Sequence, residues 1–139
     1  MSIVEIRSAL QSQLLKVSDP LPTAWEDSRF RPDSGVPWQK VHLLPNEPLN
    51  PTICNGSGEL VYEHGIFQVS LYFPRFSGPN RSARKAEEIR SVFKRGVVLS
   101  EGAVSIRVEK TPTISPSFVE GGWTVTPVSI RYYSYVRTT

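Results

Sequence analysis

One cysteine and two histidines carry the strongest intrinsic chemistry in this chain of 139 residues. Cys54 and His64 are conceivable as a nucleophile and its base, an arrangement that also needs a third group to orient the base. Cys54 lies in an Asn/Gly/Ser-rich stretch, with no helix end beside it in the sequence to favour the thiolate. His42, His64 and Cys54 also lack the spacing of converging metal ligands. We therefore expect no catalytic residue, no metal and no cofactor.

Two further patterns have conceivable chemistry but are incomplete. Glu87 and Glu88 are adjacent acids in a predicted helix, where neighbouring side chains diverge and so do not form a catalytic pair. Residues 56–58, Gly-Ser-Gly, lack the lysine and the following helix of a phosphate-binding loop. The sequence makes no positive case for an enzyme.

The elements that position these residues belong to one α+β domain spanning residues 1–139. Helical spacing of apolar residues predicts helices over residues 2–16 and 80–95. Alternating or continuous apolar runs predict strands over residues 38–44, 60–73, 103–110 and 123–136, with Gly65 as a bulge or hairpin point and Pro127 at an edge or bulge. We expect a mainly antiparallel sheet of four to five strands with both helices on one face, and long loops at about 18–37, 45–59 and 111–122.

Positive charge is concentrated in the second predicted helix. Residues 75–95 contain seven lysines and arginines against two glutamates, whereas the whole chain has a net charge of only +3. Arg81, Arg84, Lys85 and Arg95 are therefore the basic surface candidates, and they could face the phosphates of a nucleic acid. A solvated helix face is the simpler interpretation and the one we favour, because no stacking motif or helix-turn-helix accompanies the charge.

Large aromatic residues in the predicted loops suggest contacts with another protein. Trp25 and Phe30 lie in a segment stiffened by prolines, and Phe118 lies near the end of the third loop. Buried aromatic anchors dominate many protein interfaces, so these three residues are our interface candidates. They could equally hold the loops against the core of the domain, and for Trp38 this second role is favoured.

The same segment carries a family resemblance that extends over essentially the whole chain. The matching pieces are Ser2–Arg7, Ala24–Glu26, Phe30-x-Pro32, Gly35-x-Pro37-Trp38, Leu43-Leu44-Pro45-x-x-Pro48, Gly65–Val69, Phe93–Gly96, Gly122-Trp123 and Pro127–Ile130. In their order and spacing they resemble prophage-encoded proteins related to the tail terminator (tail completion) proteins of long-tailed bacteriophages. Trp38 stands where tyrosine is more usual in such proteins.

The resemblance implies a structural role in virion assembly. Tail terminators form a ring, typically a hexamer, that ends the tail tube and provides the surface joining the head. The implied partners are other copies of the chain, the tail tube protein and head–tail connector proteins, with weak DNA contact conceivable and no membrane. The implied location is the host cytoplasm during assembly and then the virion tail, if the prophage is active. Two alternatives stay open, namely a small nucleic-acid-binding module acting through residues 80–95 and another head–tail connector or adaptor.

Overall fold

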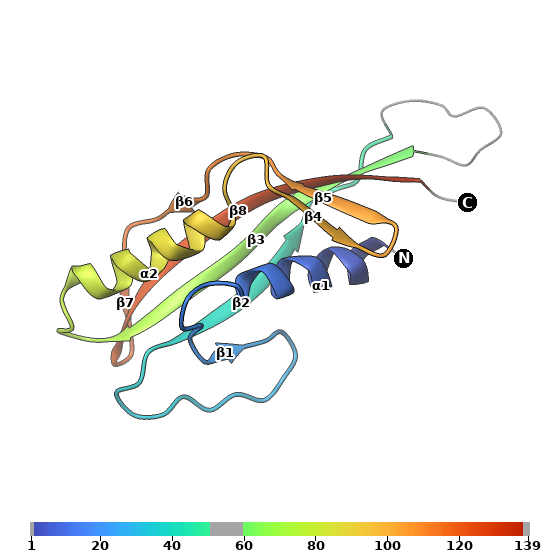
Figure 1. Ribbon diagram of the computed structural model, residues 1–139. Coiled ribbons are helices and arrows are strands. Elements are labelled where there is room, and N and C mark those ends of the chain that lie inside the picture. Colours follow the sequence, from blue (N-terminus) through green and yellow to red (C-terminus); the bar gives the residue numbers. More distant parts are fainter. Residues whose placement is uncertain (1, 51–59, 138–139) are drawn as a thin grey trace.

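The computed structural model describes residues 2–50 and 60–137. In this part of the chain two helices, α1 (Ser2–Leu14) and α2 (Pro79–Val92), lie against one sheet. The strands are β1 (Thr23–Ala24), β2 (Trp38–Pro45), β3 (Leu60–Pro74), β4 (Val98–Glu101), β5 (Val104–Val108), β6 (Thr113–Ile114), β7 (Phe118–Glu120) and β8 (Trp123–Arg137). β3 and β8, of 15 residues each, run along the length of the molecule (Figure 1).

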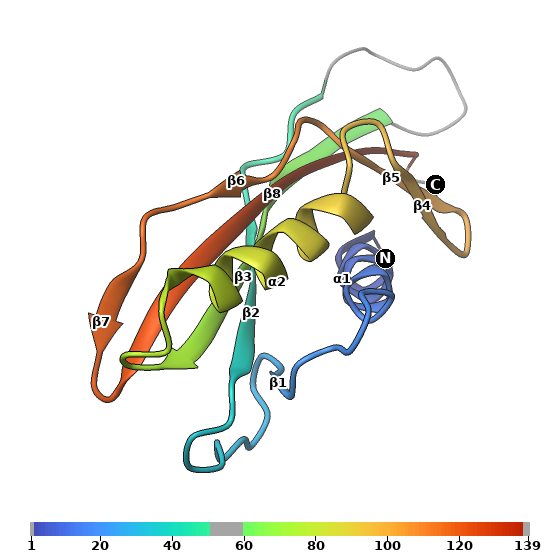
Figure 2. The same cartoon turned by 60° about the vertical axis from the view of Figure 1, so that its left-hand side comes forward.

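The strand order of the sheet is β1-β2-β3-β8-β5-β4. β6 and β7 also pair with β8, so three successive segments, β7, β6 and β5, cover the edge of β8 that faces away from β3. All these pairings are antiparallel except that of β1 with β2, which is parallel. The sheet curls around the two helices, as Figure 2 shows from a second direction.

The hydrophobic core lies between the helices and one face of the sheet. Alternation along β3 directs Phe67, Val69 and Leu71 toward this core and the intervening residues toward the other face. The helices contribute apolar residues at helical spacing: Ile6, Leu10 and Leu14 from α1, and Ala86 and Ile89 from α2. Both helices therefore cover the same face, as the apolar patterns predict.

The sheet is larger than the four to five strands expected. Its eight strands within the described residues include β1, β6 and β7, which have only two or three residues and are too short for alternation to reveal. These segments lie inside the predicted loops 18–37 and 111–122. They form because the long strands β2 and β8 offer backbone partners, which is a property of the tertiary structure. β4, which has four residues and pairs with β5, is a further strand that the sequence did not predict, and the parallel pair β1–β2 makes the sheet mixed.

Gly65 is neither a bulge nor a hairpin point, since β3 continues through it and pairs with Pro45 on one side and Tyr132 on the other. A Cβ at this position would lie 2.5 Å from the Leu44 carbonyl oxygen and 2.8 Å from the Tyr132 hydroxyl oxygen. Glycine is therefore required here by close approach of neighbouring strands.

Within the described residues no helix combines the length and apolarity needed to span a membrane.

Pro127 lies in the middle of β8, opposite Ser70, without disturbing the register. The Ser115 N–H donates to the Pro127 carbonyl at 2.9 Å, so the backbone polar groups of Pro127 face the outer edge of β8. At this point the outer edge is divided between β6 and β7. The proline, which has no N–H to donate, therefore lies where the outer ladder is interrupted.

Candidate assembly interface

A pocket of about 400 Å³ lies beside β1 and the start of β2. Three aromatic residues, Trp25, Phe30 and Trp38, are among those that line it. Trp25 packs partly against the core, whereas Phe30 reaches across to Trp38 with the ring centroids 5.1 Å apart. The structure thus brings the two predicted interface aromatics of this loop to one depression and leaves each of them partly exposed.

Trp38 belongs to the face of the sheet that carries no helix. Its ring stacks on Tyr72 at a centroid distance of 4.0 Å and meets Trp123 edge-on at 6.0 Å. It therefore holds Phe30 and its loop in place, as expected, but through an aromatic cluster outside the main core. Offset-stacked and edge-on pairs of this kind contribute beyond their buried area.

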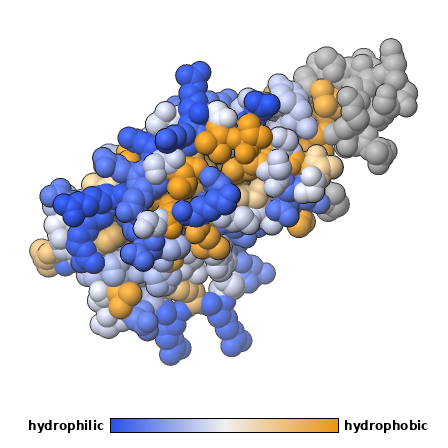
Figure 3. Space-filling view, viewed as in Figure 1, coloured by the Kyte–Doolittle hydropathy of each residue, from blue (hydrophilic) through white to orange (hydrophobic). Residues whose placement is uncertain are grey.

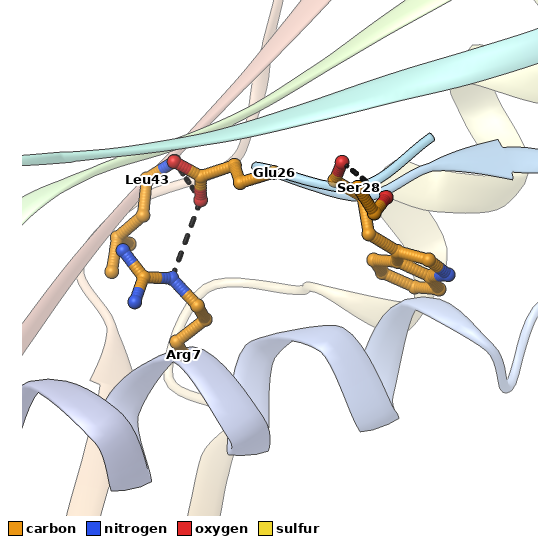
Figure 4. A network of polar contacts seen from close by, with 5 residues as sticks. Arg7, Glu26, Ser28 and Leu43 are labelled. Carbon is orange, nitrogen blue, oxygen red and sulfur yellow. Dashed lines mark hydrogen bonds and ion pairs between the residues drawn. The ribbon is translucent and has the colours of Figure 1, made fainter. Parts of the chain in front are cut away.

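One carboxylate, that of Glu26, anchors the pocket loop to its surroundings. Its Oε1 atom accepts a hydrogen bond from the Leu43 backbone N–H at 3.1 Å and one from Arg7 Nε at 3.3 Å (Figure 4). β1 pairs only with residues 39 and 40 of β2, so Glu26 supplies an acceptor to the outer edge of β2 beyond the end of β1. The Ser28 hydroxyl donates to the Trp25 carbonyl at 2.8 Å and tightens the next turn (Figure 4).

Phe118, the third predicted interface aromatic, lies in β7 at the other side of the sheet. It is about half exposed, and so is its neighbour Val119. The next residue, Glu120, accepts a hydrogen bond from the Tyr72 hydroxyl at 3.1 Å. Burial, followed by this hydrogen bond to a carboxylate, raises the pKa of Tyr72 to about 12. The structure does not bring Phe118 into the pocket of Trp25 and Phe30.

The turn between β3 and α2 carries an aromatic residue that sequence analysis missed. Phe76 is 92% exposed and has a φ of +65°, a backbone region that bulky residues rarely enter. The Arg75 guanidinium lies 4.8 Å from the centre of its ring. The signal in the sequence was an isolated aromatic between Pro74 and Gly78, since apolar side chains within a tight turn have no core to enter.

The basic residues of α2 are less free than their sequence suggests. Lys85 donates to the carbonyl oxygens of Ser18 and Asp19, both at 3.0 Å, and also pairs with Glu88 at 2.8 Å. Arg81 lies over the ring of Phe73 at 5.5 Å, so it helps to cover the core. Arg84 and Arg95 are exposed. Hydrophilic side chains crowd the part of the surface over α2, while apolar ones gather beyond its C-terminal end (Figure 3).

In the part of the chain that the structure describes, the histidines considered for chemistry are not brought together into a site. His42 is exposed on β2, while the His64 ring contacts the side chain of Asn46 at 3.4 Å and the Glu47 carbonyl oxygen at 3.2 Å. Cys54 lies outside the described residues. Among residues 2–50 and 60–137, no group of three or more His, Cys, Asp and Glu side chains could hold a metal ion.

Comparison with known proteins gives a family and a fold. A family model described as phage tail terminator protein matches residues 5–132. No curated protein matches the sequence. One solved structure resembles the chain with a TM-score of 0.77 and 22% sequence identity, over 100% of this chain and 99% of the other. At 22% sequence identity, the match to this solved structure supports the fold alone.

Proposed function

Because the chain belongs to the phage tail terminator family, it is a structural protein of the phage tail, and we propose that it closes the head-proximal end of the tail tube. In this proposal several copies form a ring on the last layer of the tube. The ring stops further addition of tube protein and presents the surface to which the head binds. We infer a hexamer that forms on the tube end from subunits that are monomeric when free.

The observation that carries the proposal is the family match over residues 5–132, which includes α2, most of α1 and most of the sheet. The structure supports it with aromatic residues that remain partly exposed at the surface. Trp25 and Phe30 border a pocket, and Phe118 is exposed on β7. Partly exposed aromatics suit contacts between proteins, so we propose these three residues as subunit or tube contacts.

The proposed partners are further copies of the chain, the tail tube protein and the head–tail connector proteins. These proteins assemble in the host cytoplasm, and the protein then remains in the tail of the finished virion. Such a role requires shape and affinity and no bond-making chemistry, in keeping with a family whose function is structural.

Deletion of the gene from an inducible prophage tests the proposal. The expected particles have overlong tails or tails without heads, visible by negative-stain electron microscopy, and the protein supplied in trans restores virions of normal length. Labelling of the protein in wild-type virions should mark the neck, which separates a terminator from an adaptor placed elsewhere. Normal filled virions from the deletion strain contradict the proposal.

A second candidate function, nucleic-acid binding through α2 and the turn after it, is favoured by exposed cations, among them Arg84 and Arg95. Because Lys85 and Arg81 are engaged within the subunit, this helix offers fewer free charges than its composition implies. Phosphate contacts make affinity fall steeply with salt, so Arg84→Ala with Arg95→Ala should reduce the slope of log affinity against log salt by about 2 if the helix binds DNA. An absence of DNA binding at low salt would exclude this second candidate function.

A further inference from the structure

The turn from residue 74 to residue 79, between β3 and α2, has the features of an interaction knob. Phe76 is almost fully exposed, and its positive φ holds a bulky side chain in a conformation that carries strain. The turn itself is fixed. The Ser77 hydroxyl donates to the Pro74 carbonyl at 2.5 Å, and the Arg75 N–H donates to the Gly122 carbonyl at 3.3 Å. A strained, well-held aromatic in solvent contributes nothing to the core of its own subunit.

The pocket of Trp25, Phe30 and Trp38 has the features of a socket. Its volume of about 400 Å³ exceeds the roughly 150 Å³ in which an apolar cavity already accommodates benzene, so one phenyl ring fits. Trp38 and Phe30 are among its lining residues, and edge-on or offset contacts of aromatic residues with a further ring are favourable. Asp27, on the loop side, is exposed and makes no hydrogen bond or ion pair within the described residues. Lys40 and His42 lie on the strand side.

We propose that Phe76 of one copy of this chain inserts into the Trp25–Phe30–Trp38 pocket of a second copy, with Arg75 pairing with the partner's Asp27. The choice of occupant rests on complementarity in shape and charge. An aromatic ring flanked by a guanidinium faces an aromatic-lined pocket with a carboxylate on its loop side. Aromatic and arginine side chains are also the residues that most often dominate interfaces.

The two surfaces are separate patches of one subunit. The turn projects at the end of the long strands, whereas the pocket lies along the edge formed by β1 and β2 (Figures 1 and 2). A contact between unlike patches is heterologous, so each bound copy still offers a free knob or a free socket to the next. Such contacts close into a ring when the rotation that relates one subunit to the next divides a full turn evenly. The inference rests on the ring of the proposed function and names the surfaces that join its subunits.

Disulfide trapping tests the contact even when free subunits associate weakly. In a Cys54→Ser background, Ser77→Cys protein, which keeps Phe76, is mixed with Ser28→Cys protein, since Ser28 lines the pocket. Oxidation should give a covalent dimer containing one of each variant. Leu15→Cys, at an exposed apolar position on neither surface, replaces Ser77→Cys in the control mixture. A yield of mixed dimer no greater than in this control overturns the proposal.

Charge reversal tests the pairing. Arg75→Glu and Asp27→Arg should each weaken association about tenfold or more, as measured by sedimentation velocity or by the trapping yield. The two changes combined in one chain restore opposite charges at every contact and should recover most of the loss. Failure of the combination to recover any association contradicts the pairing.

A third arm tests whether the contact is heterologous. Phe76→Ala protein keeps its socket and Asp27→Arg protein keeps its knob, so a mixture of the two has one intact contact, and chemical crosslinking at high concentration should capture dimers and no larger species. Failure of the Phe76 contact can be distinguished from failure of the proposed terminator function. Overlong tails on deletion together with failed trapping refute only the Phe76 contact, whereas normal virions on deletion refute the terminator role itself.

Discussion

The carboxylate of Glu26 should control the stability of the pocket loop through one backbone hydrogen bond. In the Glu26→Ala variant the Leu43 N–H, in a residue only 5% exposed, loses its acceptor. A buried donor left without a partner costs about 1–3 kcal/mol. The second contact, with Arg7, joins side chains that are 38% and 27% exposed, and such pairs contribute about 0.2–1 kcal/mol. We therefore expect Glu26→Ala to lower the free energy of unfolding by about 1–4 kcal/mol.

Two variants separate the backbone bond from the ion pair. Glu26→Gln keeps an oxygen for the Leu43 N–H and should cost about 1 kcal/mol or less, and Arg7→Met, which keeps the aliphatic stem, should cost about the same. Urea unfolding gives the free energies. Amide hydrogen exchange at Leu43 should become faster in Glu26→Ala and stay near the wild-type rate in Glu26→Gln. Equal losses in Glu26→Ala and Glu26→Gln, or unchanged exchange at Leu43 in both, would refute the reasoning.

Three further perturbations have defined outcomes. Gly65→Ala should destabilise the protein by about 3 kcal/mol in urea titrations, because the new Cβ meets backbone at 2.5 Å, while Gly122→Ala, with open space around it, should change little. Burial raises the pKa of Tyr132 to about 12 from its ordinary 10, so the folded state keeps this proton longer than the unfolded state. Stability should thus be insensitive to Tyr132 below pH 10 and fall as the pH rises from about 10 toward 12, and Tyr132→Phe should show a smaller fall in melting temperature. Lys85→Met should cost about 1 kcal/mol by releasing α2 from the segment after α1, whereas Arg84→Met should be neutral in the same thermal melts.

The long elements of this protein could be predicted from its sequence because they depend on local periodicity. The α1 pattern of Ile6, Leu10 and Leu14 requires a helix whatever it packs against. Alternation through Phe67, Val69 and Leu71 predicts a strand with one face toward the core in the same way. These two patterns also place the helices on one face of the sheet, since the helical stripe and the buried strand face must meet.

The short strands and the close approaches between strands could not be predicted in this way. β1, β6 and β7 have too few residues to show a period, and they form only because β2 and β8 present unpaired backbone. The role of Gly65 is equally non-local. Sequence can mark a glycine in a strand as unusual, but only the approach of Leu44 and Tyr132 explains why a side chain is excluded there.

For the candidate interface, the sequence by itself determined which residue types were available, namely aromatics in proline-stiffened loops and a cluster of cations in one helix. Only the tertiary structure decided which of them are free. It engaged Lys85 with two carbonyl groups, stacked Trp38 on Tyr72 and left Phe76 in solvent. The physical reason is that composition and spacing act along the chain, whereas exposure and pairing depend on partners that are distant in sequence and meet only when the sheet has formed.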